Sequence, residues 1–292
     1  MDWSNTLKTP KFWLLAIAGA IAAVHLTLLS RIDNSDIFAM SALFWLATGS
    51  LIWDRKDSLK LESQLLPSLI GIGLIGLILL RVSATPDTAF AIWMLPLVAL
   101  SGLGLLASGF TGLRQYWREL VIFGLLVAYP LLQMFLRAID LSELTAMAAA
   151  FNLSYLGFPV VRQGVFIVLP PASRVEVYGA CSGLQSILQL LCISVLFLLM
   201  FPLKHRWQQV VTVIAAIAIA FIVNSFRVSL MAVLNSGSDK NAFDYWHVGQ
   251  GSLIFSAIAV FLFGLFCWVC FLRTAPPPTP PAPTDSGAQE NA

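Results

Sequence analysis

The amino-acid sequence predicts an all-α integral membrane protein, a polytopic bundle of about eight transmembrane helices with a small outer β-like hairpin before the sixth long span. Composition is the first observation: 58% of the 292 residues are hydrophobic and only 11% are charged, whereas soluble globular chains carry roughly 25% charged residues. The second observation is a series of apolar stretches of about 20 residues, the length that a helix needs to cross a bilayer. Together they exclude a soluble enzyme.

Eight apolar stretches are candidate membrane spans, and each should be helical because backbone groups in lipid must hydrogen-bond within their own segment. In chain order they are Phe12–Leu29, Ile37–Trp53, Leu65–Leu80, Thr88–Ser108, Leu120–Phe135, Ser182–Phe201, Val210–Leu234 and Ser252–Leu272. The first follows Lys8 and Lys11 as a signal peptide would. Its apolar core is too long and lacks a cleavage site at its far end, so we expect a retained anchor.

Three segments depart from this helical pattern. Leu141–Phe158 is apolar but short and mixed, which leaves open an interfacial helix, a re-entrant helix or a full span. Gly164–Tyr178 is expected to form the small outer hairpin, with two β-like runs around a turn at Pro170–Ser173. The Pro-rich residues 275–292 cannot build a core and are expected to be a disordered cytoplasmic tail, which leaves residues 1–274 as one polytopic membrane domain.

Lysine and arginine predict the orientation, because both residue types concentrate in cytoplasmic loops. If the N-terminus is cytoplasmic and the segment between Arg137 and Ala180 is external, the basic residues inside are Lys8, Lys11, Arg55, Lys56, Lys60, Arg114, Arg118, Lys204, Arg206 and Arg273. The smaller outer set is Arg31, Arg81, Arg137, Arg162, Arg174 and Lys240. We therefore expect both chain ends in the cytoplasm.

Three polar side chains stand out because the bilayer should exclude them. Cys181 opens the sixth span, Arg227 lies within the seventh, and His247 begins the eighth. In the predicted orientation all three reach the outer leaflet. Random placement would usually divide them between the leaflets, so their coincidence predicts a single site.

These residue types fit acyl-transfer chemistry. A cysteine at a helix N-terminus and near an arginine favours the nucleophilic thiolate. His247, with an unperturbed pKa of about 6.5, can take a proton from the thiol or deliver one to a leaving amine. Arg227 can hold the thiolate or donate to the oxyanion of a tetrahedral intermediate. Gln185 and Asn224 lie one helical turn from Cys181 and Arg227, where they could bind these groups or the substrate backbone.

Each of the three also has a purely structural interpretation. Arg227 could snorkel toward a helix end, Cys181 could be an inert buried thiol, and His247 could be an interfacial residue beside Tyr245 and Trp246. Only their combination favours a functional site.

Other notable residues favour packing roles. Cys267 and Cys270 have redox spacing but lie at the cytoplasmic end of the last span, and His25 lies in mid-span. The segments Gly71–Gly73 and Gly102–Gly104 are expected to be close-packing sites between helices. The cysteines and histidines lack metal-ligand spacing, and no basic run with aromatic residues suggests nucleic acid. We therefore expect no metal, organic cofactor or nucleic-acid partner.

Taken in order, Ala180-Cys181-Ser182-Gly183-Leu184, Asn224-Ser225-Phe226-Arg227 and His247 resemble the motifs of the exosortase/archaeosortase family. The motif-bearing part covers about residues 164–261. Within it, Tyr178–Gln185 and His247–Ser252 are most similar to the cyanobacterial branch.

The resemblance implies a transpeptidase of the bacterial cytoplasmic membrane with its active site on the outer face. Its substrates would be exported proteins with a C-terminal sorting tail (PEP-CTERM), which consists of a Pro-Glu-Pro signature, a transmembrane helix and a basic cluster. A thioester would form, the tail would leave, and an unknown acceptor would resolve the acyl-enzyme. Membrane lipids surround the chain, and a separate accessory protein is implied because the extra soluble domain of some members is lacking.

The resemblance also implies roles for individual residues. Cys181 corresponds to the nucleophile, Arg227 to the arginine and His247 to the histidine of the family's triad. The supporting or substrate-binding residues would be Tyr178, Ser182, Gly183, Gln185 and Asn224.

Three alternatives remain. A transporter or channel that binds an anionic solute through Arg227 and His247 needs a path through both leaflets, yet the first five spans and the inner halves of the last three are nearly free of ionisable groups. A thiol oxidoreductase needs a second outer cysteine, and Cys192 lies about three turns deeper than Cys181. A non-catalytic scaffold explains none of the three polar residues.

Overall fold

The computed structural model describes residues 9–32, 35–84, 89–136, 138–170, 173–237, 240–247 and 251–273. These residues are mainly helical and include one small antiparallel sheet, which confirms the predicted all-α polytopic class. The predicted disordered tail, residues 275–292, lies outside the described residues.

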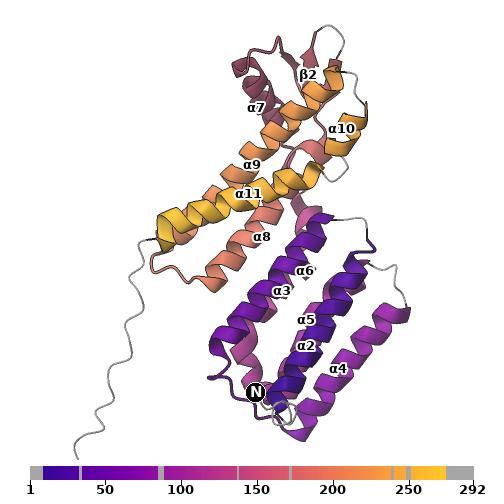
Figure 1. Cartoon of the computed structure of the whole chain (residues 1–292), viewed down its shortest axis with the longest axis vertical. Coiled ribbons are helices and arrows are strands. Elements are labelled where there is room, and N and C mark those ends of the chain that lie inside the picture. Colours follow the sequence, from indigo (N-terminus) through magenta and orange to yellow (C-terminus); the bar gives the residue numbers. More distant parts are fainter. Residues whose placement is uncertain are drawn as a thin grey trace, which may run out of the picture.

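The first five helices form a bundle, coloured indigo to magenta in the lower half of Figure 1. They are α2 (Pro10–Leu29), α3 (Ser35–Arg55), α4 (Leu65–Ala84), α5 (Ala89–Gly112) and α6 (Trp117–Leu136), with a 3₁₀ turn, η1 (Leu113–Tyr116), before α6. Phe44, Leu95 and Phe123 are completely buried in its core. Many large apolar side chains on its outer surface are exposed, as expected for helices that face lipid.

Seven helical stretches of the described chain are long and apolar enough to cross a membrane. One of them, Phe90–Leu136, contains two of the predicted spans because it runs through α5, η1 and α6. The helical backbone is interrupted at Gly109, where φ is 66°, and α5 packs against α6. Counted separately, α5 and α6 are each long enough to cross about 30 Å of hydrocarbon, which gives the eight spans predicted.

Basic residues gather at one end of this bundle. Arg55 donates to the backbone oxygen of Gln115 over 2.9 Å and forms an ion pair with the buried carboxylate of Glu119. Lys11 Nζ donates to the backbone oxygen of Lys56 over 3.4 Å. The start of α2, the α3–α4 loop and the α5–α6 connection therefore meet at the same end of the bundle.

A second group of helices, α8 (Leu184–Met200), α9 (Arg206–Ser236) and α11 (Gly251–Cys267), lies obliquely to the first (Figure 1). α11 continues into a π-helical turn, η3 (Trp268–Leu272). α8 packs against α3 and α6 and thereby joins the two groups. With 31 residues, α9 is about 46 Å long, so part of it must project beyond a hydrocarbon layer of about 30 Å.

The projecting end of α9 is covered by α7 (Ser142–Tyr155) and a three-stranded antiparallel sheet. The strands are β1 (Val161–Gln163), β2 (Phe166–Leu169) and β3 (Ser173–Glu176), in that order across the sheet. Ala146 and Ala149 of α7 pack with Ile167 of β2 and with Val228 of α9 in a small buried core. At 14 residues, or about 21 Å, α7 is too short for a full span.

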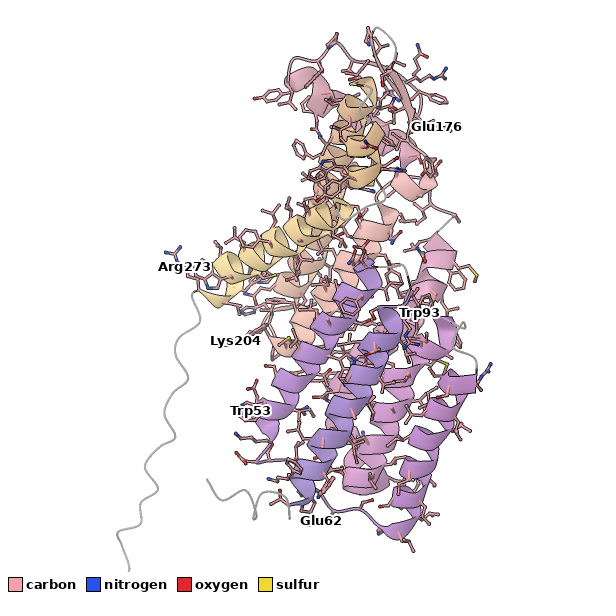
Figure 2. All side chains as sticks on the ribbon, turned by 45° about the vertical axis from the view of Figure 1, so that its right-hand side comes forward. Trp53, Glu62, Trp93, Glu176, Lys204 and Arg273 are labelled. Carbon is pink, nitrogen blue, oxygen red and sulfur yellow. The ribbon has the colours of Figure 1, made fainter. Side chains whose placement is uncertain are left out.

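The sheet contains the two predicted β-like runs and one strand that was not predicted, β1. Gly164, expected at the start of a strand, instead lies in the turn between β1 and β2 with φ of 61°. All three residues of β1 are exposed, so the alternation that reveals a half-buried strand is missing from its sequence. Figure 2 shows Glu176 of β3 at the top of the molecule and Glu62 of the α3–α4 loop at the bottom.

Candidate active site

Cys181 lies in a 3₁₀ turn, η2 (Gly179–Cys181), immediately before α8. Its backbone N–H donates to the oxygen of Tyr178 over 2.7 Å, and Ser182 Oγ donates to the oxygen of Gly179 over 2.7 Å. As predicted, Cys181 lies at the start of a candidate membrane span, Gly179–Met200, but the α-helix itself begins only at Leu184. The reason is Gly183, whose left-handed φ of 84° separates the turn from the helix.

Two other helices hold this turn in place. Asn224 of α9 is buried, and its Nδ2 donates to the backbone oxygen of Cys181 over 3.0 Å. Thr145 of α7 donates through Oγ1 to the backbone oxygen of Ser182 over 2.8 Å. At Gly183 a Cβ would lie 2.6 Å from Asn224 Nδ2, so both the backbone angle and the space require glycine here.

His247 ends a short helix, α10 (Lys240–His247), and does not begin the last span, which starts at Gly251. Arg227 of α9 donates through Nη2 to the backbone oxygen of His247 over 2.9 Å. Phe243 stacks on the imidazole with ring centroids 5.1 Å apart. The first contact holds the backbone of His247, and the second packs against one face of its ring.

The structure places Cys181, Arg227 and His247 together. Cys181 Sγ and His247 Nε2 are 3.9 Å apart, and both side chains are half-buried. A small side-chain rotation would bring thiol and imidazole into proton-transfer distance, as is common for catalytic pairs in ligand-free structures. Arg227 Nε is buried and has no hydrogen-bond partner among the described residues. The cluster thus offers a nucleophile, a base and an unused donor.

Two groups in this cluster have shifted pKa values. The pKa of His247 is lowered, first by its burial and then by the charge of Arg227, while Asp244 acts in the opposite direction. The pKa of Tyr178 is raised, chiefly by the negative charge of a Cys181 thiolate and then by desolvation. The imidazole is therefore held in its neutral, proton-accepting form, and the phenol keeps its proton beside the sulfur.

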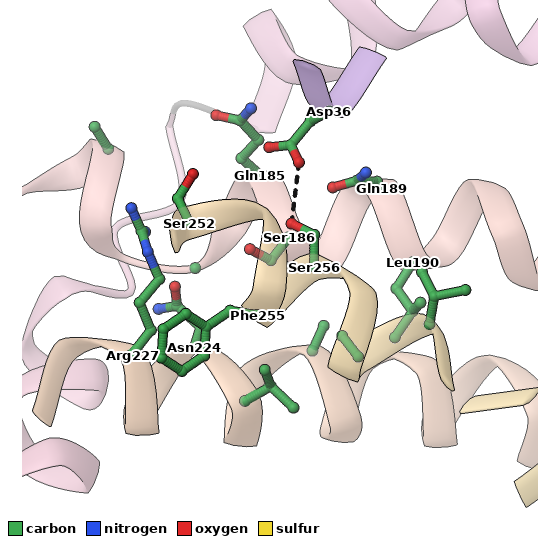
Figure 3. Close-up of a pocket in the computed structure, with 16 residues that line it drawn as sticks. Asp36, Gln185, Ser186, Gln189, Leu190, Asn224, Arg227, Ser252, Phe255 and Ser256 are labelled. Atoms are coloured by element: carbon green, nitrogen blue, oxygen red, sulfur yellow. Dashed lines mark hydrogen bonds between the residues drawn. The ribbon is translucent and has the colours of Figure 1, made fainter. Parts of the chain in front are cut away.

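A cavity of about 120 Å³ adjoins this cluster (Figure 3). Its lining includes Asn224 and Arg227 of α9. It also includes Ala180 and Gly183, which lie on either side of Cys181 in the chain. From there it continues along α8 and α11 and reaches the first turn of α3. Its polar lining there comes from Asp36, Gln185, Ser186, Gln189, Ser252 and Ser256.

Of the predicted supporting residues, Ser182, Gly183, Asn224 and Tyr178 shape the cysteine turn. Gly183, Asn224 and Gln185 line the cavity. The sequence interpretation missed Asp36, Gln189, Ser252 and Ser256 as members of the cavity lining. One signal could have found most of them: Gln185 with Gln189, and Ser252 with Ser256, are polar pairs four residues apart in otherwise apolar helices. Asp36 has no such signal, because its neighbours come from the other end of the chain.

The other candidates lie outside this cluster. His25 is completely buried and its Nδ1 accepts a hydrogen bond from Trp45 Nε1 over 3.0 Å, which fits a packing role. Cys192, Cys267 and Cys270 are free thiols. Within the described residues, no three His, Cys, Asp or Glu side chains are grouped so as to hold a metal ion.

The family model described as transmembrane exosortase matches residues 32–264, which include α3 through most of α11 and all the cavity-lining residues. No curated protein and no solved structure matches the chain.

Proposed function

Because the chain belongs to the transmembrane exosortase family, we propose that it is a cysteine transpeptidase. In this proposal it cleaves the C-terminal sorting tail of exported proteins at the outer face of the bacterial cytoplasmic membrane. The family implies a membrane-embedded processing enzyme, and the cysteine chemistry is supported by one observation above all. That observation is the 3.9 Å approach of Cys181 Sγ to His247 Nε2 beside Arg227.

In the proposed first step, His247 Nε2 takes the thiol proton and the thiolate attacks the carbonyl carbon of the scissile peptide bond. A C–S bond forms, and the carbonyl oxygen becomes an oxyanion. Arg227 Nε, which has no partner among the described residues, is the donor left for that oxyanion. The C–N bond then breaks, His247 returns its proton to the leaving amine, and the thioester remains on Cys181.

The sheet is a candidate for aligning the extended substrate, because its edge strand β1 is fully exposed and strand edges bind peptides through main-chain hydrogen bonds. β3 leads within two residues to Tyr178 and the cysteine turn. In the order β1-β2-β3 the exposed edge lies two strands from β3, so a sorting motif paired with β1 would be held beside the sheet that leads into the cysteine turn. The substrate's transmembrane helix would dock laterally among the spans.

The direct test follows a tagged reporter protein that ends in Pro-Glu-Pro, an apolar helix and a basic cluster, co-expressed with the protein. We expect Cys181→Ser to accumulate the uncleaved reporter. Cys270→Ser, which alters an exposed free thiol at the far end of α11, should process it at the wild-type rate. A hydroxylamine-sensitive adduct should form in the wild type and be absent from Cys181→Ser.

Normal cleavage of the reporter by well-inserted Cys181→Ser protein would contradict the proposal. The transporter alternative predicts that Cys181→Ser remains functional, because a solute site formed by Arg227 and His247 does not require the thiol. Solute uptake that survives in Cys181→Ser but is lost in Arg227→Gln would favour that alternative.

A further inference from the structure

The cavity beside Cys181 contains a carboxylate that the cleavage step does not use. Asp36, in the first turn of α3, lines the cavity together with Arg227, Asn224 and residues of α8 and α11. An acidic residue in a first helical turn is commonly explained by the helix dipole. Here, however, its Oδ1 accepts a hydrogen bond from Ser256 Oγ over 3.0 Å, across 220 residues of sequence. Figure 3 shows this bond at the cavity wall.

The cavity meets the requirements of a site for a small polar molecule. Its volume of about 120 Å³ is several times the roughly 10–15 Å³ that one water needs, so it accepts a group of a few atoms, whereas a helix is too wide for it. It touches Ala180 and Gly183, so its occupant would lie beside an acyl group on Cys181. A thioester at this position can be resolved by an amine, an alcohol or water.

The charges of the lining distinguish among these three. A carboxylate can take a proton from any of the three, but only the amine arrives as a cation, which a carboxylate also attracts and holds. Arg227 in the same lining repels an ammonium and so favours the neutral amine, which is the nucleophilic form. The side-chain oxygens of Gln185, Gln189 and Ser186 can accept the remaining hydrogen bonds of the nitrogen.

Resting on the proposed function, we propose that this cavity is the acceptor site of the transpeptidase, that it takes a primary amine, and that Asp36 binds the ammonium and removes its proton. The amine nitrogen then attacks the thioester carbonyl. A C–N bond forms, the C–S bond breaks, and the sulfur leaves as the Cys181 thiolate. The second proton of the nitrogen passes through His247 to that thiolate, and the proton on Asp36 returns to solvent. The product is an amide.

The test uses the full-length protein in lipid nanodiscs with the tagged reporter, and it measures acyl-enzyme and transfer product separately. Biotin-cadaverine supplies a primary amine, and a biotinylated alcohol of equal length supplies the matched comparison. Vesicles with ethanolamine headgroups, set against vesicles with choline headgroups, distinguish a lipid amine from a free one. We expect wild-type transfer to one or both amines and none to the alcohol or to choline lipid.

Asp36→Asn should still form the thioester but should transfer it to the amine roughly a hundredfold more slowly, the low end of what a positioned base contributes. Asp54→Asn, the same substitution at an exposed position near the other end of α3, should behave as wild type. Ser256→Ala removes the hydrogen bond but keeps the carboxylate, so it should retain most of the transfer. Asp36→Glu should restore part of it.

Equal transfer by Asp36→Asn and wild type, or equal wild-type transfer to amine and alcohol, would overturn the proposal. So would a Ser256→Ala defect as large as that of Asp36→Asn, because Asp36 would then act only by joining α3 to α11. Absence of the thioester in the wild type itself would instead contradict the proposed function. The two failures are thus distinguishable.

Discussion

Asn224 holds the backbone of Cys181 in place, and its loss should separate positioning from chemistry. We expect Asn224→Ala to slow thioester formation about fivefold, because one hydrogen bond of this kind contributes about 1 kcal/mol. Single-turnover labelling with the tagged reporter measures this rate. Asn235→Ala is the matched control, since it removes a 2.8 Å hydrogen bond to Ser173 near the end of the same helix. Equal rates for both variants would show that Asn224 does not position the turn.

The lowered pKa of His247 predicts the acidic limit of activity. Neutral imidazole must accept the thiol proton, so thioester formation should persist below the ordinary histidine pKa of 6.5. Asp244 raises the pKa of His247, so Asp244→Asn should lower it further and move the acidic limb of the pH–rate profile to lower pH. The shift should be small because Asp244 is exposed and screened.

The profile is measured as the rate of thioester formation between pH 4.5 and 8, with the exposed Asp57→Asn as control. Movement of the limb to higher pH in Asp244→Asn would contradict the assignment of His247 as the base. The lowered pKa of His247 also makes the folded state less stable at acidic pH. The unfolded state binds the His247 proton at higher pH than the folded state, so this group destabilises the fold as pH falls below about 6.5.

At the residue scale, the sequence indicated which polar side chains are unusual but not how each backbone segment holds them. Cys181, Arg227 and His247 could be chosen because hydropathy places them in or beside apolar spans. The left-handed Gly183 that separates the cysteine turn from the start of α8 could not, since glycine has many uses in membrane helices. Asp36 was missed for a different reason: its contact with Ser256 joins distant parts of the chain and depends on how whole helices pack.

At the scale of helices, the tight contact between α4 and α5 explains one glycine of each predicted pair, Gly71 and Gly102. A Cβ on Gly71 would lie 2.4 Å from the backbone oxygen of Gly102, and one on Gly102 would lie 2.6 Å from that of Gly71. This confirms the predicted close packing for these two glycines. A Cβ on Gly73 would meet no other part of the protein within 4 Å, and one on Gly104 would approach Leu113 of η1 instead, so the prediction does not hold for the α4–α5 contact at these two glycines.

Gly71→Ala should therefore destabilise the protein, because overpacking of a close contact costs about 1–3 kcal/mol. Gly73→Ala on the same helix should be neutral or slightly stabilising, since alanine is the better helix former and space is free. Thermal unfolding in detergent, followed by loss of the main peak in size-exclusion chromatography, compares the two. Similar midpoints for both variants would show that the α4–α5 contact yields without cost.

Hydropathy located the spans well because lipid imposes one requirement on all of them, a run of about 20 apolar residues. It could not settle Leu141–Phe158, where length and composition fit several arrangements. Packing decides that segment: α7 is held to α9 by Asn152 Nδ2, which donates to Ser225 Oγ over 3.1 Å, and by Ser229 Oγ, which donates to the backbone oxygen of Ala149 over 3.2 Å. No local pattern in the sequence reports such contacts.

At the scale of the whole molecule, two groups of helices meet where the cavity lies. α8 packs on α3 and α6, and Asp36 of α3 reaches Ser256 of α11. The oblique angle between the groups, visible in Figure 1, depends on packing between helices that no apolar pattern specifies. The cavity thus draws on both halves of the chain, although Cys181, Arg227 and His247 all come from the second.

The distribution of basic residues predicts which end of the molecule faces the cytoplasm. Glu176 of β3 and Lys204 in the α8–α9 connection are both exposed, and Figure 2 shows them well apart. In a background with Cys181→Ser and Cys270→Ser, we expect Glu176→Cys to react with a membrane-impermeant maleimide in intact spheroplasts. Lys204→Cys and Arg273→Cys should react only after permeabilisation, because both positions lie at helix ends that are expected to face the cytoplasm. Reaction of Lys204→Cys but not of Glu176→Cys in intact spheroplasts would show that the molecule has the opposite orientation in the membrane. Cys181 would then be unable to meet exported substrates.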